Sequence, residues 1–269
     1  MEFSVIMSVY RKDDPSWLKI ALNCLFEQTI QPTEIVLVED GPIPDILQAV
    51  IDEVMEDHPI FNVIKKEKNQ GLGLALKTAV DAAKYDVLAR MDADDIIPSD
   101  RFEKQIKSIE KGYDVVSCWS QLFVGDMNNI VAIKKRPEKH EEIVKLAHKR
   151  SPVCHAACMM RKGAILKAGN YMDSPLYEDY HLWIRMIMSG AKFYNIQEVL
   201  YFVRTTEDQA KRRSGYKYLK TEMAFFKEFY KKGFFTTTDY VKNVFIRTII
   251  RLAPSPIRFV MFKKIWNHK

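Results

Sequence analysis

The sequence contains no long apolar segment. Among its 269 residues, no run of about 18 apolar residues is free of charged side chains, and a membrane-spanning helix needs a run of roughly that length. The N-terminus, MEFSVIMSVYRKDD, enters a strand-like segment directly and has neither the basic stretch nor the cleavage site of a secretory signal. We therefore expect a cytoplasmic protein that does not span a membrane.

Cysteine is also scarce. The four cysteines, Cys24, Cys118, Cys154 and Cys158, lie mostly in apolar contexts and show no pairing pattern, which fits a reducing compartment. Cys154, His155 and Cys158 are neighbours in sequence, but no second pair of ligands with zinc-site spacing accompanies them. The sequence therefore argues against a zinc site.

The chain does have enough apolar material for a full core. It is 47% hydrophobic and 12% aromatic, which predicts one large domain with an appendage. The net charge of +6 is unevenly distributed: residues 1–210 carry 26 Lys and Arg against 32 Asp and Glu, and residues 211–269 carry 15 against 3. A basic segment with interleaved aromatics is typical of binding to nucleic acid or to an anionic membrane surface.

Strand-like and helix-like segments alternate through the first half. The strand-like runs are SVIMSV, EIVLVED, NVIKK and DVLARMD, and helices are expected over about 15–27, 44–56 and 72–83. This is the βαβαβαβ pattern of a parallel sheet covered on both faces. DVVSCWSQLFVG and NIVAIKK follow, separated by a turn-rich interval at 126–129, and they predict an antiparallel pair.

The second half is less regular. A polar helix is expected over 139–150, a segment at 154–171 has no assignable pattern, and a helix begins at Glu178 and Asp179 and ends near Gly190. Farther along, an apolar helical stripe repeats at spacings of three and four, which predicts a face packed on the core. Its members are Tyr216, Leu219, Met223, Phe226 and Tyr230.

Three carboxylates follow the buried strand-like run at 87–91. Asp92, Asp94 and Asp95 repel one another there, and a divalent cation with oxygen ligands suits such a cluster. Ligands of open α/β sheets collect at the carboxyl ends of the strands, so a phosphorylated ligand is expected at the same edge. The alternative is a solvated Asp-rich turn that caps the next helix.

A second strand delivers polar groups to the same edge. It ends in Glu39, Asp40 and Gly41, and Asn69, Gly71 and Gly73 follow the third strand. A dinucleotide-binding fold would also place glycines after a strand. It is disfavoured because position 76 is Leu and because the first strand–helix turn, SVYRKDDP, has no glycine.

These groups indicate a chemistry. A metal, a nucleotide-sized edge and the separate Glu178–Asp179 pair favour transfer of a group from a nucleotide diphosphate to a hydroxyl, with a carboxylate accepting the proton. Read alone, Glu178 and Asp179 are more typical of acids that complement a helix dipole.

Five ordered motifs together resemble family 2 glycosyltransferases of the GT-A fold, in particular the small amylovoran-type bacterial enzymes of exopolysaccharide and O-antigen assembly. The motifs are SVIMSVY near the N-terminus, VEDG at 38–41, NQGLG at 69–73, ARMDADDIIPSDRF at 89–102 and YEDYHLWIRM at 177–186. The resemblance implies an α/β fold with a mixed, mostly parallel sheet flanked by helices. It divides the chain into a catalytic domain, 1–215, and a C-terminal basic amphipathic helical extension, 216–269.

The resemblance also implies inverting transfer of a sugar from a nucleotide-sugar donor, commonly UDP-linked, with Mn²⁺ or Mg²⁺ as cofactor. Asp179 would be the catalytic base, and Asp92 and Asp94 would form the metal and ribose motif, with Asp94 as the direct ligand. The base and ribose pocket would be lined by Ser8, Val9, Tyr10 and Asp40.

Arginines late in the chain are candidates for binding the donor diphosphate. Arg204, Arg212 and Arg213 are placed to do so because guanidinium groups bind phosphate in a bidentate manner, although a solvated basic loop is the alternative. The resemblance places His155 near the acceptor, while a structural histidine is equally consistent. Residues 209–213 lack the Gln-x-x-Arg-Trp motif of processive members, so we expect addition of one sugar.

The C-terminal segment, residues 245–269, mixes large apolar side chains with Arg and Lys. That composition favours helices lying in a membrane interface, broken near Pro254 and Pro256, and it fits a polyprenyl-diphosphate-linked saccharide acceptor. We therefore expect peripheral association with the inner face of the cytoplasmic membrane, and no nucleic-acid partner. The alternative is an ordinary amphipathic helix docked on the core.

Two other functions share some of these sequence features. A sugar-nucleotide nucleotidyltransferase would share the α/β sheet and the metal, but it would normally carry a Gly-rich basic signature after the first strand, and SVYRKDDP has none. A non-catalytic nucleotide-sugar-binding module would be favoured if Asp94 or Asp179 were dispensable.

Overall fold

The structure is a computed structural model that describes residues 1–174, 176–205 and 216–252. Its elements are β1 (Ser4–Val9), α1 (Pro15–Phe26), β2 (Glu34–Glu39), α2 (Asp45–Asp57), β3 (Phe61–Lys65), α3 (Leu72–Ala82), β4 (Val87–Arg90), α4 (Arg101–Glu110), β5 (Val115–Val124), β6 (Asp126–Lys134), α5 (His140–Ala147), the 3-10 turn η1 (His155–Ala157), β7 (Met159–Arg161), α6 (Lys162–Lys167), α7 (Glu178–Met188), β8 (Phe193–Arg204), α9 (Tyr216–Lys231) and α10 (Thr237–Leu252).

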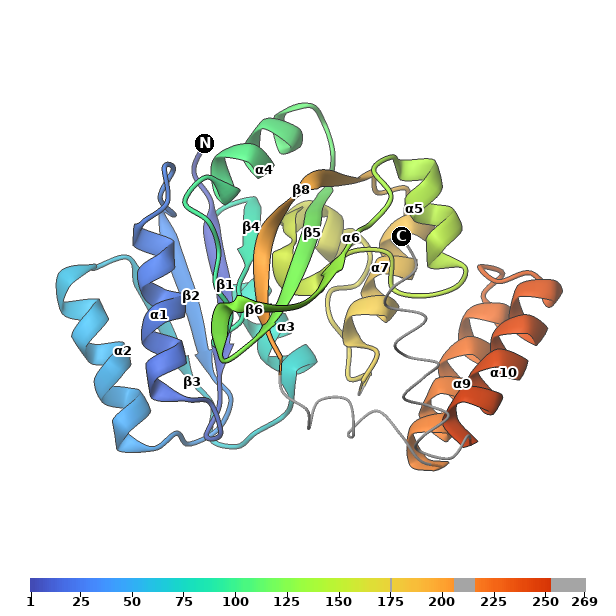
Figure 1. Cartoon of the computed structure of the whole chain (residues 1–269), viewed down its shortest axis with the longest axis horizontal. Helices are drawn as coiled ribbons and strands as arrows, with labels where there is room; N and C mark the ends of the chain where they lie inside the picture. The colour runs from blue at the N-terminus through green and yellow to red at the C-terminus, as the bar shows by residue number, and fades with distance from the viewer. Residues whose placement is uncertain (175, 206–215, 253–269) are drawn as a thin grey trace.

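The described strands form one eight-stranded mixed sheet in the order β3-β2-β1-β4-β7-β5-β6, with β8 paired to β5 (Figure 1). Strands β3, β2, β1 and β4 are mutually parallel, and β8 is parallel to β5. Strand β7 is antiparallel to β4 and to β5, and β6 is antiparallel to β5. The predicted α/β class with a mixed, mostly parallel sheet flanked by helices is therefore confirmed.

Alternating side chains of the central strands enter two cores. Val5 and Met7 of β1 pack with α1, α2 and α4, whereas Ile6 packs with α3, α6 and α7 on the other face. A strand buried on both faces must be apolar at successive positions, which is why SVIMSV and EIVLVE read as continuous apolar runs. The helices on both faces confirm the layered arrangement expected from the sequence.

Three segments differ from the expectations. Residues 126–129 belong to strand β6, and the reversal occurs one residue earlier at Gly125, where φ is +67°. The segment 154–171, which has no assignable pattern, forms η1, β7 and α6. The sequence analysis also assigns no strand between 190 and 216, yet β8 is a 12-residue strand that pairs along nearly the whole of β5.

Helices α9 and α10 pack together beside α5 and α7 (Figure 1). Phe226 and Phe229 of α9 are fully buried in a third core with Tyr180 and Ile184 of α7. The expected apolar stripe of this helix is confirmed in its middle, while Tyr230 is 37% exposed. No helix in the described part of the chain is long and apolar enough to cross a bilayer. Pro254 and Pro256 lie outside the described residues.

Candidate active site

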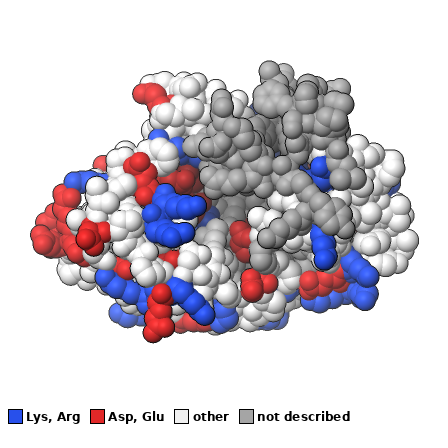
Figure 2. Space-filling model, turned by 90° about the horizontal axis from the view of Figure 1, so that it is seen from below, with Lys and Arg blue, Asp and Glu red and all other residues white. Residues whose placement is uncertain are grey.

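Three acidic side chains gather where β4 ends. Asp92, Asp94 and Asp95 offer carboxylate oxygens that all lie within 4.8 Å of one another, and they are the one such group of potential metal ligands among the described residues. Strands β1, β2 and β4 are parallel, so their carboxyl ends open on the same edge of the sheet. Figure 2 views the molecule from this side, where acidic and basic side chains both reach the surface.

Each of these aspartates has a different environment. Asp92 pairs with buried Arg90, whose two terminal nitrogens contact its oxygens at 2.5 and 3.1 Å. Asp95 is 2% exposed, and its Oδ1 accepts a hydrogen bond from the backbone N–H of Arg204 at 2.8 Å. Asp94 is half-buried. Hydrogen bonds from Arg90 and from the Arg204 backbone therefore fix the carboxylates of Asp92 and Asp95.

The cluster favours a bound cation electrostatically. Burial, followed by the charge of Asp92, raises the pKa of Asp94 to about 6. Burial and then Asp92 and Asp94 also raise the pKa of Asp95. Closely spaced oxygen donors of this kind match the ligand preference of Mn²⁺ and Mg²⁺, and a divalent ion would offset the repulsion. The residues present therefore fit the metal that the sequence predicts.

The structure adds a fourth carboxylate that the sequence analysis did not single out. Asp13 follows β1, and its Oδ2 accepts a hydrogen bond from the backbone N–H of Tyr10 at 2.9 Å. Burial raises its pKa to about 7, and the charges of Asp94 and Asp92 add to that increase. The two adjacent aspartates in RKDDP, directly after the first strand, are the sequence feature that points to it.

Asp40 links the loop after β2 to the NQGLG loop through hydrogen bonds. Its two oxygens accept hydrogen bonds from the backbone N–H groups of Gln70 and Gly71, at 2.9 and 2.8 Å, and Asn69 donates to its carbonyl. The carboxylate predicted to line the base and ribose pocket therefore orders the NQGLG loop in this structure. Ser8, Val9 and Tyr10 lie at the adjacent end of β1, where the Asp40 N–H donates to the Val9 carbonyl.

Gly41 allows the close contact between the Asp40 loop and the NQGLG loop, and we predict that Gly41→Ala is strongly destabilising. Its φ is +89°, and an added Cβ would lie 2.5 Å from the backbone nitrogen of Asn69. The free energy of unfolding in urea should fall by more than about 2 kcal/mol, because backbone strain and a clash combine. Gly112→Ala is the control, since its φ is +92° and its Cβ would meet nothing within 4 Å. Equal losses in the two variants would contradict the prediction.

Arg204 lies next to the acidic cluster at the end of β8. It is 7% exposed, donates from Nε to the carbonyl of Asp94 at 3.0 Å, and stacks over Trp17 and Phe123. The guanidinium is therefore part of the packed wall of the site and not of a solvated loop, and its binding to the donor diphosphate stays a prediction. Arg212 and Arg213 lie outside the described residues.

Asp179 stands in the first turn of α7, as predicted. Ser151 Oγ donates a hydrogen bond to its Oδ2 at 2.8 Å. The helix lies close to the NQGLG loop, because a Cβ added to Gly73 would meet the Cβ of Glu178 at 3.1 Å. Ser151 was not identified from the sequence, in which nothing links it to a residue 28 positions away.

A buried hydrogen-bonded pair, His155 and Tyr171, is influenced electrostatically from both acidic sites. His155 Nε2 and the Tyr171 hydroxyl form a hydrogen bond of 2.8 Å, and burial, followed by the charge of Arg90, lowers the pKa of His155 well below its usual range. Tyr171 lies within electrostatic reach of both Arg90 and Asp179. Arg90, which pairs with Asp92, and Asp179 in the first turn of α7 therefore both influence the charge state of Tyr171.

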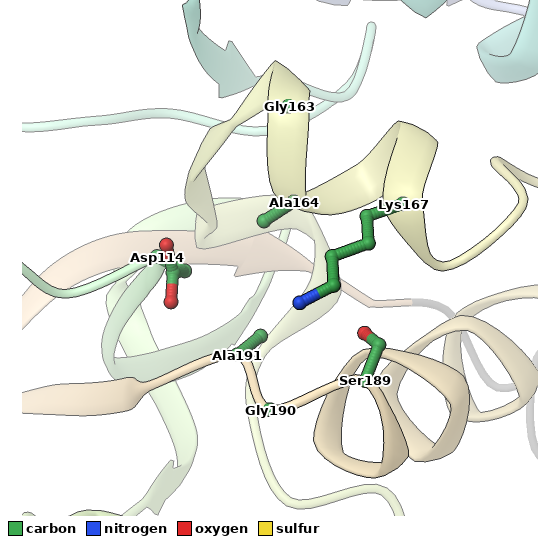
Figure 3. Close-up of a pocket in the computed structure, with 7 residues that line it drawn as sticks. All are labelled: Asp114, Gly163, Ala164, Lys167, Ser189, Gly190 and Ala191. Atoms are coloured by element: carbon green, nitrogen blue, oxygen red, sulfur yellow. The ribbon is translucent and has the colours of Figure 1, made fainter.

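A pocket of about 200 Å³ elsewhere on the molecule is not part of this site. Figure 3 shows the Lys167 ammonium reaching into it near Ser189, with Asp114 on another wall. Asp114 and Ala191 precede β5 and β8. The pocket therefore opens at the amino ends of these strands, whereas the acidic cluster is at the carboxyl end of β4.

The fold is similar to that of a solved protein that binds a nucleotide sugar. The crystal structure of S. aureus TarS 1–349 in complex with UDP-GlcNAc superposes with a TM-score of 0.64 at 17% identity, covering 85% of this chain and 66% of that one. At this level of identity the likeness concerns the fold, which is GT-A.

Sequence comparisons extend over nearly the whole chain. It is 35% identical over 266 residues to the "UDP-Gal:alpha-D-GlcNAc-diphosphoundecaprenol beta-1,3-galactosyltransferase" of Escherichia coli, covering 98% of this chain and 96% of the relative. It is 34% identical over 265 residues to the "Amylovoran biosynthesis glycosyltransferase AmsE" of Erwinia amylovora, covering 97% and 98%. The model of the family described as "Glycosyl transferase family 2" matches residues 4–169. The acidic cluster, the GT-A fold and these matches agree, and the chain belongs to glycosyltransferase family 2.

Proposed function

We propose that this glycosyltransferase moves one sugar, with inversion, from a UDP-sugar to a hydroxyl of a saccharide carried on a polyprenyl diphosphate, in the assembly of a bacterial surface polysaccharide. The E. coli relative's name specifies a UDP-Gal donor and a diphosphoundecaprenol-linked acceptor, and the TarS complex contains UDP-GlcNAc. Near full-length similarity to the first of these supports a donor and acceptor of the same classes.

One observation carries the proposal: a metal-compatible acid cluster and a separate, hydrogen-bonded carboxylate both act electrostatically on the buried Tyr171. Asp92, Asp94 and Asp95 suit the diphosphate side of the donor, and Asp179, oriented by Ser151, suits an acceptor hydroxyl. The reaction needs both functions, because the leaving diphosphate must be stabilised and the incoming hydroxyl must lose a proton.

The proposed step is a single displacement. Asp179 accepts the proton of the acceptor hydroxyl, whose oxygen forms the new bond to the anomeric carbon. The bond from that carbon to the phosphate oxygen breaks, and its electron pair leaves with UDP. Attack opposite to the leaving group inverts the anomeric centre. Mn²⁺ or Mg²⁺, held by Asp94 with Asp92, would supply charge neutralisation for the diphosphate.

Product analysis tests this function. The full-length protein is incubated with UDP-galactose, UDP-glucose or an N-acetyl form, together with a sugar linked to an alkyl diphosphate, and the new linkage is determined by NMR. An α-linked donor should give a single β-linked sugar per acceptor. An α-linked product would rule out inversion, and UDP binding without transfer would favour a non-catalytic binding module.

Helix α10 is the proposed membrane contact. Val241, Phe245, Ile246 and Ile249 share one side of it and are 57%, 66%, 51% and 45% exposed, and Lys242 beside them is also exposed. Exposed apolar side chains with an adjacent cation fit the interface of an anionic bilayer. The opposite side of α10 is occupied, since Asn243 and Arg247 bond to the carbonyls of His148 and Lys149.

We predict that the double variant Phe245→Ser, Ile249→Ser loses membrane binding. Its partition onto phosphatidylglycerol vesicles in a sedimentation assay should fall at least about tenfold, because two exposed apolar side chains are no longer available to enter the interface. Ile46→Ser is the matched control, since Ile46 is 64% exposed on α2. Unchanged sedimentation of the double variant would refute α10 as the contact.

A further inference from the structure

Two arginines, Arg136 and Arg150, have no role in the reaction proposed above. Arg136 follows β6, and its backbone carbonyl accepts hydrogen bonds from Trp119 Nε1 and Gln197 Nε2, both at 3.1 Å. This anchors its backbone on β5 and β8. Arg150 follows α5 and directly precedes Ser151, whose hydroxyl holds Asp179. The two guanidinium groups therefore come from separate segments that both lead to the base.

Neither guanidinium forms a hydrogen bond or an ion pair with any residue in the part of the chain that the structure describes. The Nε of half-buried Arg136 is inaccessible to solvent and unpaired. Arg161, Arg204, Arg247 and other arginines of the body each donate to a carbonyl or carboxylate. A buried donor without an acceptor is unfavourable, and a bound ion or water is one of the partners that such a group can take.

Charge interactions link Arg136 to Arg150 and to Asp179, and Arg150 is next to Ser151, which contacts Asp179. Burial is the main cause that lowers the pKa of Arg136. Cys154 raises this pKa, the charge of Arg150 lowers it further, and the charge of Asp179 raises it. Partial desolvation, followed by the charge of Arg247, lowers the pKa of Arg150, whose side chain is still exposed to solvent. Adjacent cations of this kind repel one another, so an anion with several oxygens would stabilise both. Guanidinium groups recognise phosphate oxygens in bidentate geometry.

We propose that Arg136 and Arg150 bind the diphosphate of the lipid-linked acceptor. The inference rests on the proposed function and names the site for its acceptor. The donor diphosphate belongs at the Asp92–Asp94 cluster, whereas these arginines adjoin Asp179, which contacts the acceptor hydroxyl. In a monosaccharide acceptor, the hydroxyl and the diphosphate are separated by a single sugar ring. A base and an anion site on neighbouring residues therefore match the two ends of that sugar.

Binding of geranyl diphosphate, with the donor site saturated by UDP and Mg²⁺, tests the site without requiring transfer. Calorimetry should show that Arg150→Gln and Arg136→Gln each weaken geranyl diphosphate binding about tenfold or more, the loss of one charge-assisted contact. Arg150→Lys should lie between Gln and wild type, because it keeps the charge and loses the fork geometry. Lys139→Gln removes the same charge at the other end of α5 and should have no effect.

Two results would overturn the proposal. Geranyl diphosphate affinity within twofold of wild type in Arg150→Gln, an exposed position that should fold normally, would show that no such site exists. A parallel loss of UDP affinity would assign the arginines to the donor. Failure of all transfer with intact geranyl diphosphate binding would count against the proposed function and leave this site standing. Intact transfer by the wild-type protein, with geranyl diphosphate affinity unaltered in the arginine variants, would support the proposed function and rule out this site.

A kinetic arm distinguishes an acceptor site from general stabilisation. For a sugar on an alkyl diphosphate, Arg150→Gln should raise the acceptor KM about tenfold with little change in kcat. For the same sugar as a neutral alkyl glycoside, the KM should not change. A fall in kcat that is equal for both acceptors would mean that Arg150 acts on the base through Ser151, and the diphosphate assignment would be wrong.

Discussion

Asp179→Asn is expected to reduce the transfer rate by about 10²–10⁴-fold, the range associated with loss of a general base. UDP and metal affinity should be unchanged, because the substitution is isosteric and the amide oxygen can still accept the hydrogen bond from Ser151. The rate is measured with a saturating acceptor, and UDP affinity by calorimetry with Mn²⁺. Loss of rate without loss of affinity is the outcome that assigns Asp179 to proton transfer.

The control for this variant is Asp173→Asn, which makes the same chemical change at an exposed position in the loop before α7. It should transfer at the wild-type rate. A rate for Asp179→Asn within tenfold of wild type would show that another group accepts the proton. Loss of UDP affinity in Asp179→Asn would mean that the residue supports the donor site instead.

Asp94→Asn should abolish metal-dependent UDP binding and at the same time stabilise the metal-free protein. In the folded state burial and Asp92 raise the pKa of Asp94 from 3.8 to about 6, so ionising this carboxyl at neutral pH costs folding free energy. Removing the charge should increase the free energy of unfolding in EDTA at pH 7.5 by on the order of 1 kcal/mol.

The pH dependence of that gain has a definite sign. A raised folded-state pKa makes the wild-type protein less stable as pH rises from 3.8 through about 6. The advantage of Asp94→Asn should therefore be largest above pH 6 and vanish near pH 4. Urea unfolding at both values measures it, with Asp57→Asn on the exposed end of α2 as control. A pH-independent difference, or UDP binding that still requires Mn²⁺, would contradict the assignment of Asp94.

Local sequence patterns are sufficient to predict the first half of the sheet and the edge that carries the candidate site. Continuous apolar runs such as SVIMSV identify strands buried on both faces, and helical periodicity between them requires parallel pairing. Once the strands are parallel, groups at their carboxyl ends must share one edge. Asp92, Asp94 and Asp40 could therefore be grouped, and Asp179 could be assigned to the first turn of a helix, from local patterns alone.

The contacts of the acid cluster and of Asp179 depend on tertiary packing. Tyr201 and Arg204 reach the acid cluster from β8, which is more than 100 residues away and whose pairing with β5 has no local signature. Ser151 meets Asp179 only because α5 and α7 pack together. The unpaired state of Arg136 likewise depends on burial between β5 and β8. Charge pairing and pKa values follow from such distant neighbours and from solvent exclusion, and a linear pattern of residue types contains neither.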